Sequence, residues 1–182
     1  MHQVGGVRAR RRQGTEGPAV EVRGREGGGV VRTVQKASRA DRAGWEAIWA
    51  DNCRHFDASD MDRLSIDALW VRILDPAHPM DAWLAFDEAV GPDPVGLAHT
   101  ILHPHTFPLK QVCYLEDLFV APAARRRGIA RALIAAVAEA GRLHGWQRIY
   151  WVTETTNVTA QRLYASLARQ VDQHTYAIDL GR

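Results

Sequence analysis

The sequence predicts one α/β domain of three layers (α/β/α), in which helices cover both faces of a mixed, mostly antiparallel sheet. The first observation is the order of the elements that the hydrophobic pattern predicts: strand, two helices, three strands, helix, strand, helix and strand. The second is the length of 182 residues, which suffices for one domain with a sizeable core. The third is an ordinary globular composition, with apolar stretches well short of the ~18 residues that a membrane span requires.

The N-terminal segment differs in composition from the rest of the chain. Residues 1–29 are rich in Gly and Arg, so we expect them to be disordered and the folded domain to cover residues 30–182. Residues 1–32 hold seven Arg and three Glu, a net charge of +4, whereas the whole chain carries +2. The remaining residues therefore carry −2, which argues against a nucleic-acid partner for the domain. An arm that binds nucleic acid or a membrane stays the alternative to an unstructured extension.

Residues 30–73 predict a strand followed by two helices. The β-branched run at 30–34 predicts the strand. Ser38 or Asp41 is expected to cap the first helix, which carries large apolar residues at helical spacing. The same spacing predicts the second helix over about 61–73.

A β-hairpin and a loop are expected next. Residues 82–88 and 95–102 are predicted strands, joined by the turn-rich segment 91–94. The loop 103–108 is bounded by proline and contains two histidines without an acidic or cysteine partner at ligand spacing. We therefore expect no metal site.

The second half of the domain alternates strands with helices. A strand over 111–120 precedes a helix over about 126–144, which has one apolar face and the stop residue Gly145. Three further elements are predicted: a strand over 148–153, a helix from Thr156 or Asn157 to about Leu167, and a final strand over about 173–180.

The segment from Cys113 to Leu133 carries the strongest chemical signal. Its strand ends at Ala121-Pro122, and three consecutive arginines then lead to Gly128 and a helix. The first turn of that helix has unpaired backbone N–H groups and the positive end of the helix dipole. Glycine lets a ligand approach the backbone closely, so the segment is suited to bind a pyrophosphate. No nucleotide P-loop pattern is present in the sequence.

Two motifs give the chain a resemblance to a known family. The pattern Arg125-x-x-Gly128-x-Ala130, after Leu-Glu-Asp-Leu-Phe-Val, is similar to the acetyl-CoA-binding signature of the GNAT N-acetyltransferase superfamily. Downstream, Tyr-Trp-Val-Thr leads to Asn157, which is followed by Ala160 and Tyr164, as in that family. Both motifs most resemble two subgroups, the diamine (spermidine/spermine) acetyltransferases and the yeast histone/polyamine and D-amino-acid acetyltransferases.

The resemblance implies acetyl-CoA as co-substrate. Backbone N–H groups at 126–131 would hold the pyrophosphate, with arginine side chains adding charge-assisted bonds. The N–H of Leu118 would face the thioester carbonyl, at a point where two neighbouring strands separate. Asn157 would support the pantetheine arm, although simple capping of the helix explains it equally well. The expected cofactor-binding residues are Leu118, Phe119, Val120, Arg125, Arg126, Arg127, Gly128, Ile129, Ala130, Arg131 and Asn157.

Two residues are candidates for proton transfer. The resemblance implies Tyr164 as the acid that protonates the leaving thiolate; packing of its ring between helix and sheet is the alternative. Glu116 is the candidate base for the amine, acting through water as in the diamine-acetylating relatives, and pairing with a local arginine is its alternative. Strand alternation predicts Glu116 on the face of Leu118 and Val120, with Asp117 on the opposite face.

The expected activity is transfer of an acetyl group to a primary amine of a small molecule, a polyamine or an amino acid. Direct attack in a ternary complex is expected, because neither cysteine is placed as an acyl carrier; both are expected to be reduced cytoplasmic thiols. A protein lysine acceptor and a non-catalytic CoA-binding module are the alternatives. Dimers are common in the family, so a homodimer stays open.

The acceptor side is defined less sharply by the sequence. In the family, the first two helices overlie the acceptor entrance, so three aromatic residues there either line an amine pocket or pack in the core: Trp49, Phe56 and Trp70. The acidic residues Asp57, Asp60 and Asp62 suggest either a polyamine channel or a solvated loop. Residues 168–171 replace the Gly-Phe pair of most relatives, so the final strand is open to a different placement.

Overall fold

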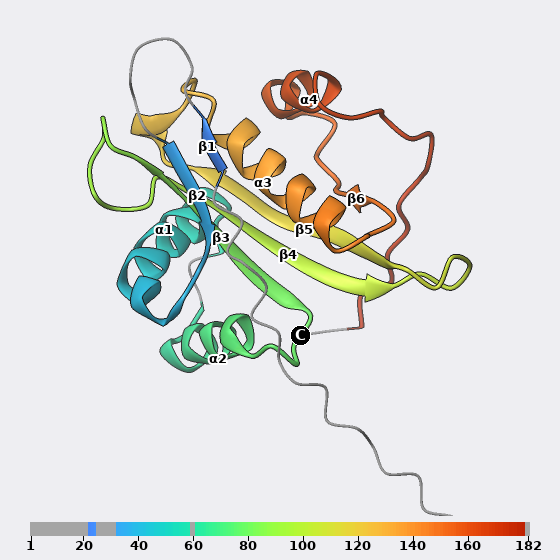
Figure 1. Cartoon of the computed structure of the whole chain (residues 1–182), viewed down its shortest axis with the longest axis horizontal. Coiled ribbons are helices and arrows are strands. Elements are labelled where there is room, and N and C mark those ends of the chain that lie inside the picture. Colours follow the sequence, from blue (N-terminus) through green and yellow to red (C-terminus); the bar gives the residue numbers. More distant parts are fainter. Residues whose placement is uncertain (1–21, 25–31, 59–60, 181–182) are drawn as a thin grey trace, which may run out of the picture.

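A computed structural model describes residues 22–24, 32–58 and 61–180 (Figure 1). These residues form a six-stranded sheet in the order β1-β2-β3-β4-β5-β6. Neighbouring strands are antiparallel from β1 to β5, whereas β5 and β6 are parallel. The predicted mixed, mostly antiparallel sheet is therefore confirmed. The strands are β1 Val22–Gly24, β2 Arg32–Lys36, β3 Met80–Asp87, β4 Gly96–Pro104, β5 Gln111–Val120 and β6 Ile149–Tyr150.

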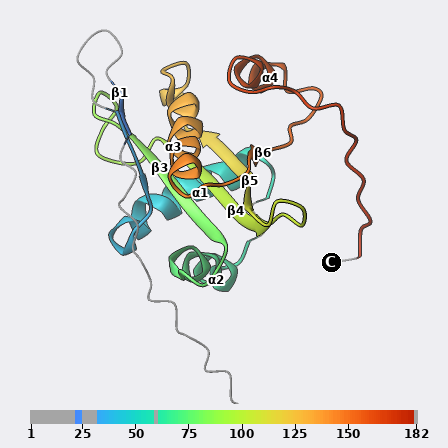
Figure 2. The same cartoon turned by 45° about the vertical axis from the view of Figure 1, so that its right-hand side comes forward.

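Helices cover both faces of this sheet, as the three-layer prediction requires. Helices α1 and α2 lie against one face, and α3 lies against the other with α4 beside it (Figures 1 and 2). None of the described helices is long and apolar enough to cross a bilayer. The helices are α1 Arg42–His55, α2 Arg63–Leu74, α3 Ile129–Leu143 and α4 Val158–Ala165, with short 3-10 helices η1 Arg39–Asp41 and η2 Pro122–Ala124.

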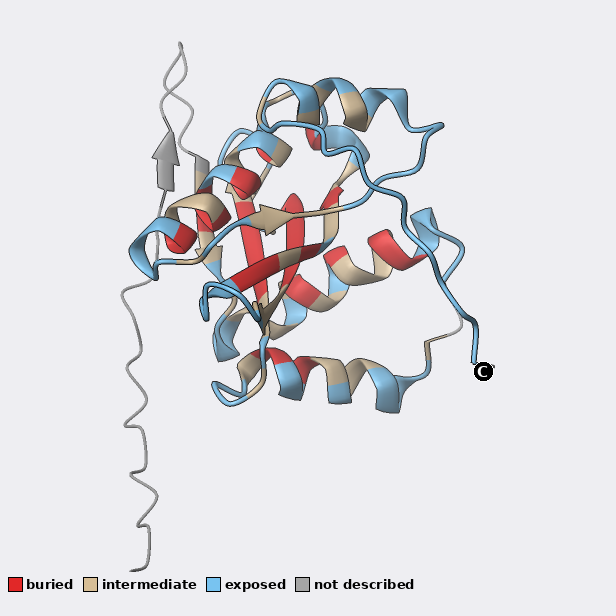
Figure 3. Cartoon of the chain, turned by 90° about the vertical axis from the view of Figure 1, so that its right-hand side faces the viewer, coloured by how far each residue is buried: buried red, intermediate tan, exposed pale blue. Residues whose placement is uncertain are grey.

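The sheet separates two apolar cores, and the buried residues of the helices face it (Figure 3). The α3-face core includes Trp83, Ala98, Leu115, Ile129 and Leu133. The α1–α2-face core includes Trp45, Trp70, Leu84, Leu97 and Phe119. Gly96 lets α3 approach β4, because a Cβ there would lie 2.6 Å from Cγ2 of Ile129. Alternation along β3 and β4 thus supplies both cores from the same strands.

Local capping chemistry sets where several helices begin and end. Ser38 and Asp41 form a capping box at η1, which leads directly into α1. Asp62 caps α2, since its Oδ1 accepts the N–H of Ser65 at 2.7 Å. Gly145, at φ +68°, follows the end of α3. The expected roles of Ser38 at the start of η1 and of Gly145 after α3 are confirmed, whereas Asp41 precedes α1 without a side-chain hydrogen bond to that helix.

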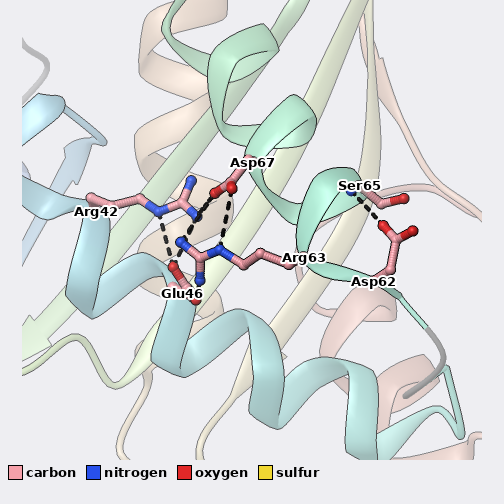
Figure 4. Close-up of polar contacts among 6 residues, drawn as sticks. All are labelled: Arg42, Glu46, Asp62, Arg63, Ser65 and Asp67. Atoms are coloured by element: carbon pink, nitrogen blue, oxygen red, sulfur yellow. Dashed lines mark hydrogen bonds and ion pairs between the residues drawn. The ribbon is translucent and has the colours of Figure 1, made fainter.

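A network of four charges joins the first two helices (Figure 4). Arg42 of α1 contacts Glu46 in its own helix at 2.9 Å and Asp67 of α2 at 2.6 Å. Arg63 of α2 contacts Glu46 and Asp67 in return. The guanidinium of Arg42 also lies over the rings of Trp45 and Trp70. The network therefore lies directly over the α1–α2-face core.

Two boundaries differ from those that the sequence predicts. Strand β1 lies within the segment 1–29 that was expected to be disordered. It pairs antiparallel with β2, and local composition does not encode this pairing. The other residues of that segment, 1–21 and 25–29, lie outside the described residues. Helix α3 begins at Ile129 rather than at Arg126. Arg126 and Gly128 have φ values of +61° and +80°, so the chain is not helical before Ile129.

The prediction of a final strand over 173–180 is wrong for the described chain. Residues 169–180 have no secondary structure, and β6 is only two residues long. A strand needs a neighbour for its backbone groups, and the segment after α4 runs clear of the sheet (Figure 2). Residues 173–180 therefore have the sequence pattern of a strand but no partner strand within the described chain.

Candidate active site

Strand β5 contains a β-bulge at Glu116. The register pairs Asp117 with His99 and Leu115 with Thr100, so Glu116 has no opposite residue in β4. A bulge inserts one residue and locally breaks the alternation of side chains. At the bulge, the odd-numbered side chains change from one face of the sheet to the other. Cys113 and Leu115, before the bulge, belong to the α3-face core, and Phe119, after it, belongs to the α1–α2-face core.

Beyond the bulge, one edge of β5 is open in the described chain. Strand β6 pairs with β5 only at residues 113–114. The N–H of Ala121 donates to the carbonyl of Val95, toward β4, at 3.0 Å. Because backbone groups alternate between the two edges of a strand, the N–H groups of Leu118 and Val120 point away from β4. These donors lie along the edge that β6 leaves uncovered.

A buried chain of hydrogen bonds ends at Asp117. The Nε1–H of Trp45 donates to Nε2 of His99 at 3.0 Å, and Nδ1 of His99 lies 2.9 Å from Oδ2 of Asp117. Indole N–H is only a donor, so Nε2 of His99 must be the accepting nitrogen. This pattern assigns the ring proton to Nδ1, which donates it to the carboxylate. Trp45 and His99 are fully buried, whereas Asp117 is partly exposed.

The two adjacent carboxylates have different surroundings. Asp117 accepts the hydrogen bond of His99, whereas Glu116 has an exposed side chain without such a donor. Partial desolvation raises the pKa of Glu116, and the charge of Asp117 raises it further, while His99 lowers it. The alternation that would separate the two carboxylates across the sheet therefore fails at the bulge. Asp117 faces α1, where Trp45 and His99 hold it, and the separation of the two carboxylates by simple alternation stays a prediction.

The N-terminus of α3 follows the open edge of β5. Gly128 is its N-cap residue, and no side chain caps the first turn. The first intrahelical bond of this turn runs from the N–H of Ala132 to the carbonyl of Gly128. The N–H groups of Ile129, Ala130 and Arg131 therefore have no partner inside the helix. Unpaired N–H groups and the helix dipole together favour an anion at this place.

The arginines around this turn have separate structural roles. Arg127 donates from Nε to Oδ2 of Asp87 at 2.8 Å, and that carboxylate is fully buried. Arg125 donates from Nε to the carbonyl of Val120 at 3.1 Å, on the open edge of β5. Arg131 donates to the hydroxyl of Ser166 at 2.8 Å and so links α3 to α4. Arg127 is thus committed to anchoring the loop on β3.

Other expected cofactor-binding residues can act only through their backbone. The side chains of Phe119 and Ile129 are buried in the two cores. Leu118 and Val120 pack partly against the α3-face core. Arg126 is exposed, and its positive φ turns the backbone just before the helix. Among the three consecutive arginines, Arg126 has the side chain most accessible to an anion.

Helix α4 carries the two residues of the second motif. Asn157 caps the helix, since its Oδ1 accepts the N–H of Ala160 at 3.1 Å. Tyr164 is half-buried beside the α3-face core, with its ring 5.3 Å from that of Trp151 in an edge-on arrangement. Burial raises the pKa of Tyr164, so its phenol stays protonated at neutral pH. Both the capping of Asn157 and the ring packing of Tyr164 are therefore present.

The aromatic residues of the acceptor side are divided by burial. Trp70 lies in the α1–α2-face core. The ring of Trp49 lies 4.9 Å from that of His99, and its buried Nε1–H has no hydrogen-bond partner within the described chain. Phe56 is exposed. Trp49 thus lies against the His99 ring of the network that ends at Asp117.

The acidic residues before α2 give little support to a channel. Asp62 is the cap of α2, and the N–H of Ser65 lowers its pKa. Asp57 is exposed with φ +52°, and Asp60 lies outside the described residues. The helix cap therefore accounts for one of the three carboxylates.

A cavity of about 300 Å³ lies where the end of α1 meets the end of β5. Phe119, one of its lining residues, is two residues from Asp117 on the same face, about 7 Å along the strand. Its lining contains two guanidinium groups, of Arg54 and Arg125, and the carboxylate of Asp51, which pairs with Arg54. The lining residues are Asp51, Arg54, His55, Phe119, Pro122 and Arg125.

Neither cysteine has the environment of a nucleophile. Burial raises the pKa of Cys113 to about 12, with a further contribution from Asp81. Burial and the charge of Asp117 raise the pKa of Cys53. His103 donates to or accepts from the hydroxyl of Tyr150 at 2.9 Å. Within the described ranges, no group of three or more His, Cys, Asp or Glu side chains could hold a metal ion.

His99 and Trp45 are the site residues that the sequence did not indicate. His99 lies on β4 and Trp45 on α1, 54 positions apart, and only the register and the α1 packing bring them together. A histidine at an apolar strand position was the one available signal, and it does not identify a partner. The arrangement as a whole offers a carboxylate pair, an open strand edge, a phenol and an anion-binding turn.

Comparison with known proteins agrees with the features of the candidate site described above. Residues 44–168 match the family described as Acetyltransferase (GNAT) family. The chain is 32% identical over 147 residues to the D-amino-acid N-acetyltransferase HPA3 of Saccharomyces cerevisiae, covering 81% of this chain and 88% of that protein. This agrees with the subgroup that the motifs resemble.

Solved structures share the fold. A probable acetyltransferase superposes with a TM-score of 0.73 at 21% identity, covering 82% of this chain and 98% of that one. The aminoglycoside acetyltransferase HMB0005, from an uncultured soil metagenomic sample, superposes with a TM-score of 0.70 at 25% identity, covering 82% and 99%. The protein belongs to the GNAT acetyltransferase family and is an N-acetyltransferase of the GNAT type.

Proposed function

We propose that the protein transfers the acetyl group of acetyl-CoA to the primary amine of a small molecule, either an amino acid or a polyamine, in a ternary complex. The observation that carries the proposal is the pair Glu116 and Asp117 at the bulge of β5, with Asp117 held by His99. An ammonium group is complementary to two adjacent carboxylates. Acetyl-CoA is the donor that GNAT acetyltransferases use.

Glu116 takes the proton that the amine must lose before it can attack. Its raised pKa makes it a better base than an ordinary glutamate, because the proton-transfer driving force increases with the pKa of the base. Asp117 lies beside it and accepts a hydrogen bond from His99, which fixes the position of the carboxylate. The two carboxylates therefore divide the work: Asp117 binds the ammonium, and Glu116 accepts its proton, directly or through water.

The amine nitrogen then attacks the thioester carbonyl carbon. The N–H of Leu118, on the open edge of β5, donates to the oxygen that becomes negative, and such a donor is typically worth ~3 kcal/mol. When the C–S bond breaks, Tyr164 gives its phenolic proton to the leaving thiolate. The nitrogen is cationic after the attack and loses a second proton as the amide forms; this proton restores the phenol of Tyr164 through solvent, and Glu116 releases its own proton to solvent. The products are the N-acetylated amine, CoA and one proton.

The pyrophosphate of acetyl-CoA lies at the N-terminus of α3 in this proposal. Backbone N–H groups of Ile129, Ala130 and Arg131 hold it, and Arg126 adds positive charge. Asn157 fixes the start of α4 and supports the pantetheine arm. Arg127 keeps the turn in place through Asp87.

The cavity near Phe119 favours an acceptor with an anionic group. Asp51 pairs with Arg54, so Arg125 is the lining guanidinium that the carboxylate of an amino acid can approach, whereas a polyamine has no carboxylate. The yeast relative acts on D-amino acids by its name, which supports the same choice. We therefore rank amino acids before polyamines.

Residues 30–182 form the catalytic domain in this proposal, and residues 1–29 take no part in the chemistry. We place the enzyme in the cytoplasm, because Cys53 and Cys113 are free, buried thiols that suit a reducing compartment. We also propose that it acts as a homodimer.

The test is release of free CoA from acetyl-CoA by the full chain. The acceptors would be D- and L-amino acids, polyamines, an aminoglycoside and a lysine-containing peptide. We expect saturable release with one small-molecule class and a loss of at least tenfold in kcat for Tyr164→Phe. Tyr176→Phe, which removes the same hydroxyl from an exposed ring, serves as the matched control and should keep full activity.

Three outcomes would contradict the proposal. Release with the lysine peptide alone would make the protein a protein acetyltransferase. Binding of acetyl-CoA without release by any amine would indicate a CoA-binding module. Equal activity of Tyr164→Phe and the unaltered chain would remove Tyr164 from the chemistry.

A further inference from the structure

Three aromatic side chains lie together on neighbouring strands: His103 of β4, Tyr114 of β5 and Tyr150 of β6. The ring of Tyr114 lies 5.0 Å from that of Tyr150, and the ring of His103 meets Tyr150 edge-on at 5.9 Å. All three residues are partly exposed, and neither tyrosine belongs to one of the two apolar cores. We call His103, Tyr114 and Tyr150 the aromatic platform.

The aromatic platform lies on the same face of the sheet as Asp117. His99 and His103 stand at alternate positions of β4, so their side chains project from one face. Tyr114 lies opposite Ile101, midway between the two histidines, and facing residues of paired strands share a face. The Tyr114 ring is therefore one strand step, about 7 Å, from the place where His99 holds Asp117.

Tyr150 is held from two sides, and one of its contacts is with a cation. Its hydroxyl lies 2.9 Å from Nε2 of His103. The guanidinium of Arg148 lies 5.2 Å from the centre of its ring, a favourable arrangement for a cation and an aromatic face. A second cationic group at this ring would be repelled by Arg148. The aromatic platform therefore favours an uncharged ring over another ammonium, because offset and edge-on ring pairs are stabilising.

Tyr114 is also close to Glu116. The two residues are two positions apart on β5; burial raises the pKa of Tyr114, and the charge of Glu116 raises it further. An amine that gives its proton to Glu116 would thus lie within about one strand step of the Tyr114 ring. In an aromatic amino acid, three bonds of about 1.5 Å separate the amine nitrogen from the ring, which suits a spacing of this order.

We propose that the aromatic platform binds the side chain of an aromatic amino acid, and that this is the class of acceptor that the enzyme acetylates best. The amine lies at Glu116 and Asp117, and the ring packs on Tyr114 beside Tyr150. The carboxylate points the other way along β5, toward Arg125. Because the three groups leave the α-carbon in different directions, these contacts also distinguish the two enantiomers. The inference rests on the proposed acetyl transfer to amino acids and adds the side chain that the site selects.

The experiment compares kcat/KM of the full chain for a series of amino acids with acetyl-CoA as donor. The series is alanine, leucine, phenylalanine and cyclohexylalanine, each as both enantiomers. In the preferred hand we expect phenylalanine to exceed leucine about tenfold, near the upper limit of what one aromatic pair contributes. Cyclohexylalanine has a ring of similar size without a π-face, so it should fall roughly threefold or more below phenylalanine.

Two substitutions at one position test where the ring binds. Tyr114→Leu removes the aromatic ring and keeps an apolar side chain, so the ratio of phenylalanine to leucine should fall close to one. Tyr114→Phe keeps the ring and should keep the ratio. Each ratio is taken within one variant, so a smaller folded fraction lowers both rates and cancels. The acceptor series of the unaltered chain decides the question if Tyr114→Leu does not fold.

Several results would overturn the inference, and they differ from those that overturn the proposed function. Acetylation of amino acids without a preference for phenylalanine removes the aromatic class and leaves the proposed function standing. A preference that Tyr114→Leu retains shows that the ring binds elsewhere. Equal rates with phenylalanine and cyclohexylalanine show that apolar volume is recognised instead of an aromatic face. If polyamines alone are acetylated, this inference fails and the acetyl transfer stands; if no amine accelerates release of CoA, both fail.

Discussion

Glu116 and Asp117 are adjacent in the sequence and yet have different environments. Asp117 is held by the buried pair Trp45 and His99, whereas Glu116 lies at the bulge without a comparable donor. The pKa of Glu116 is raised, which suits this carboxyl group to accept a proton. The difference comes from one inserted residue in the ladder between β4 and β5.

Replacing His99 with Leu is expected to move the acidic limb of the kcat/KM–pH profile to higher pH and to lower kcat/KM at least tenfold. His99 lowers the pKa of Glu116 and holds Asp117 by a hydrogen bond, so its loss raises the pKa of Glu116 and frees the carboxylate beside it. Trp45→Phe, which removes only the indole donor to His99, should shift the limb in the same direction by less. If the acidic limb of the kcat/KM–pH profile is the same in His99→Leu as in the unaltered chain, His99 has a packing role only.

Replacing Glu116 with Gln is expected to lower activity and to raise Tm at neutral pH. The folded state raises the pKa of Glu116, so it binds the proton more tightly than the unfolded chain does. The stability linked to this proton is present below the unfolded pKa and is lost as pH rises through the folded pKa. The gain of Glu116→Gln should therefore vanish below about pH 4.

Thermal unfolding at pH 7.5 and pH 3.5 measures this difference. Glu88→Gln, at an exposed glutamate just after β3, is the control and should change neither Tm nor activity. A lower Tm for Glu116→Gln at pH 7.5 would show that the carboxylate is stabilising and would contradict the sign.

At the scale of elements, the turn between β5 and α3 determines how an anion can be bound. Three residues shape it: Arg126 and Gly128 with positive φ, and Arg127 anchored on the buried Asp87. Starting the helix at Ile129 rather than at Arg126 places the free N–H groups after the arginine run. The arginines therefore differ in function although the sequence presents them as equivalents.

Arg127→Gln is expected to lower Tm by several degrees and to change the KM for acetyl-CoA mainly through the displaced turn. It removes a two-point contact with a fully buried carboxylate. Arg126→Gln is the matched substitution at an exposed neighbour, and it should raise the KM for acetyl-CoA while leaving Tm unchanged. The reverse pattern, with Tm lost at Arg126 and KM at Arg127, would contradict the assignment.

At the scale of the whole molecule, the sheet carries two cores and the site lies where its strands separate. Helices α1 and α2 cover one face, and α3 and α4 cover the other. The α1–α2 pair is joined by the charges of Arg42, Glu46, Arg63 and Asp67 over its aromatic core (Figure 4). Movement of α2 relative to α1 would have to break this network.

Arg42→Ala is expected to lower Tm more than Arg63→Ala. Arg42 is largely covered and lies over Trp45 and Trp70, so its loss removes ring contacts as well as ion pairs. Arg63 is mostly exposed, and exposed ion pairs contribute little to stability. Thermal unfolding at low salt and at 1 M salt tests this, and only the effect of Arg63→Ala should disappear at high salt. If Arg42→Ala and Arg63→Ala lower Tm equally at both salt concentrations, the contacts of Arg42 with the two Trp rings add nothing to stability.

The sequence by itself determined the family, the positions of the two motifs and the order of the elements from β2 to α4. Period-2 and period-3.6 patterns, helix caps such as Ser38 and Gly145, and the spacing from Asn157 to Tyr164 are local properties. Local rules are set by neighbouring residues, so they can be read without knowing which strands pair. The anion-binding turn could be located for the same reason.

Only the tertiary structure decided the details that make the site. The bulge at Glu116 depends on the register with β4, and the link from Trp45 to Asp117 joins α1, β4 and β5. The pairing of Arg127 with Asp87 and the unpaired final strand likewise depend on segments far apart in the chain. Strand register and side-chain pairing are non-local, because a strand's pattern specifies a face to bury but not the partner that buries it.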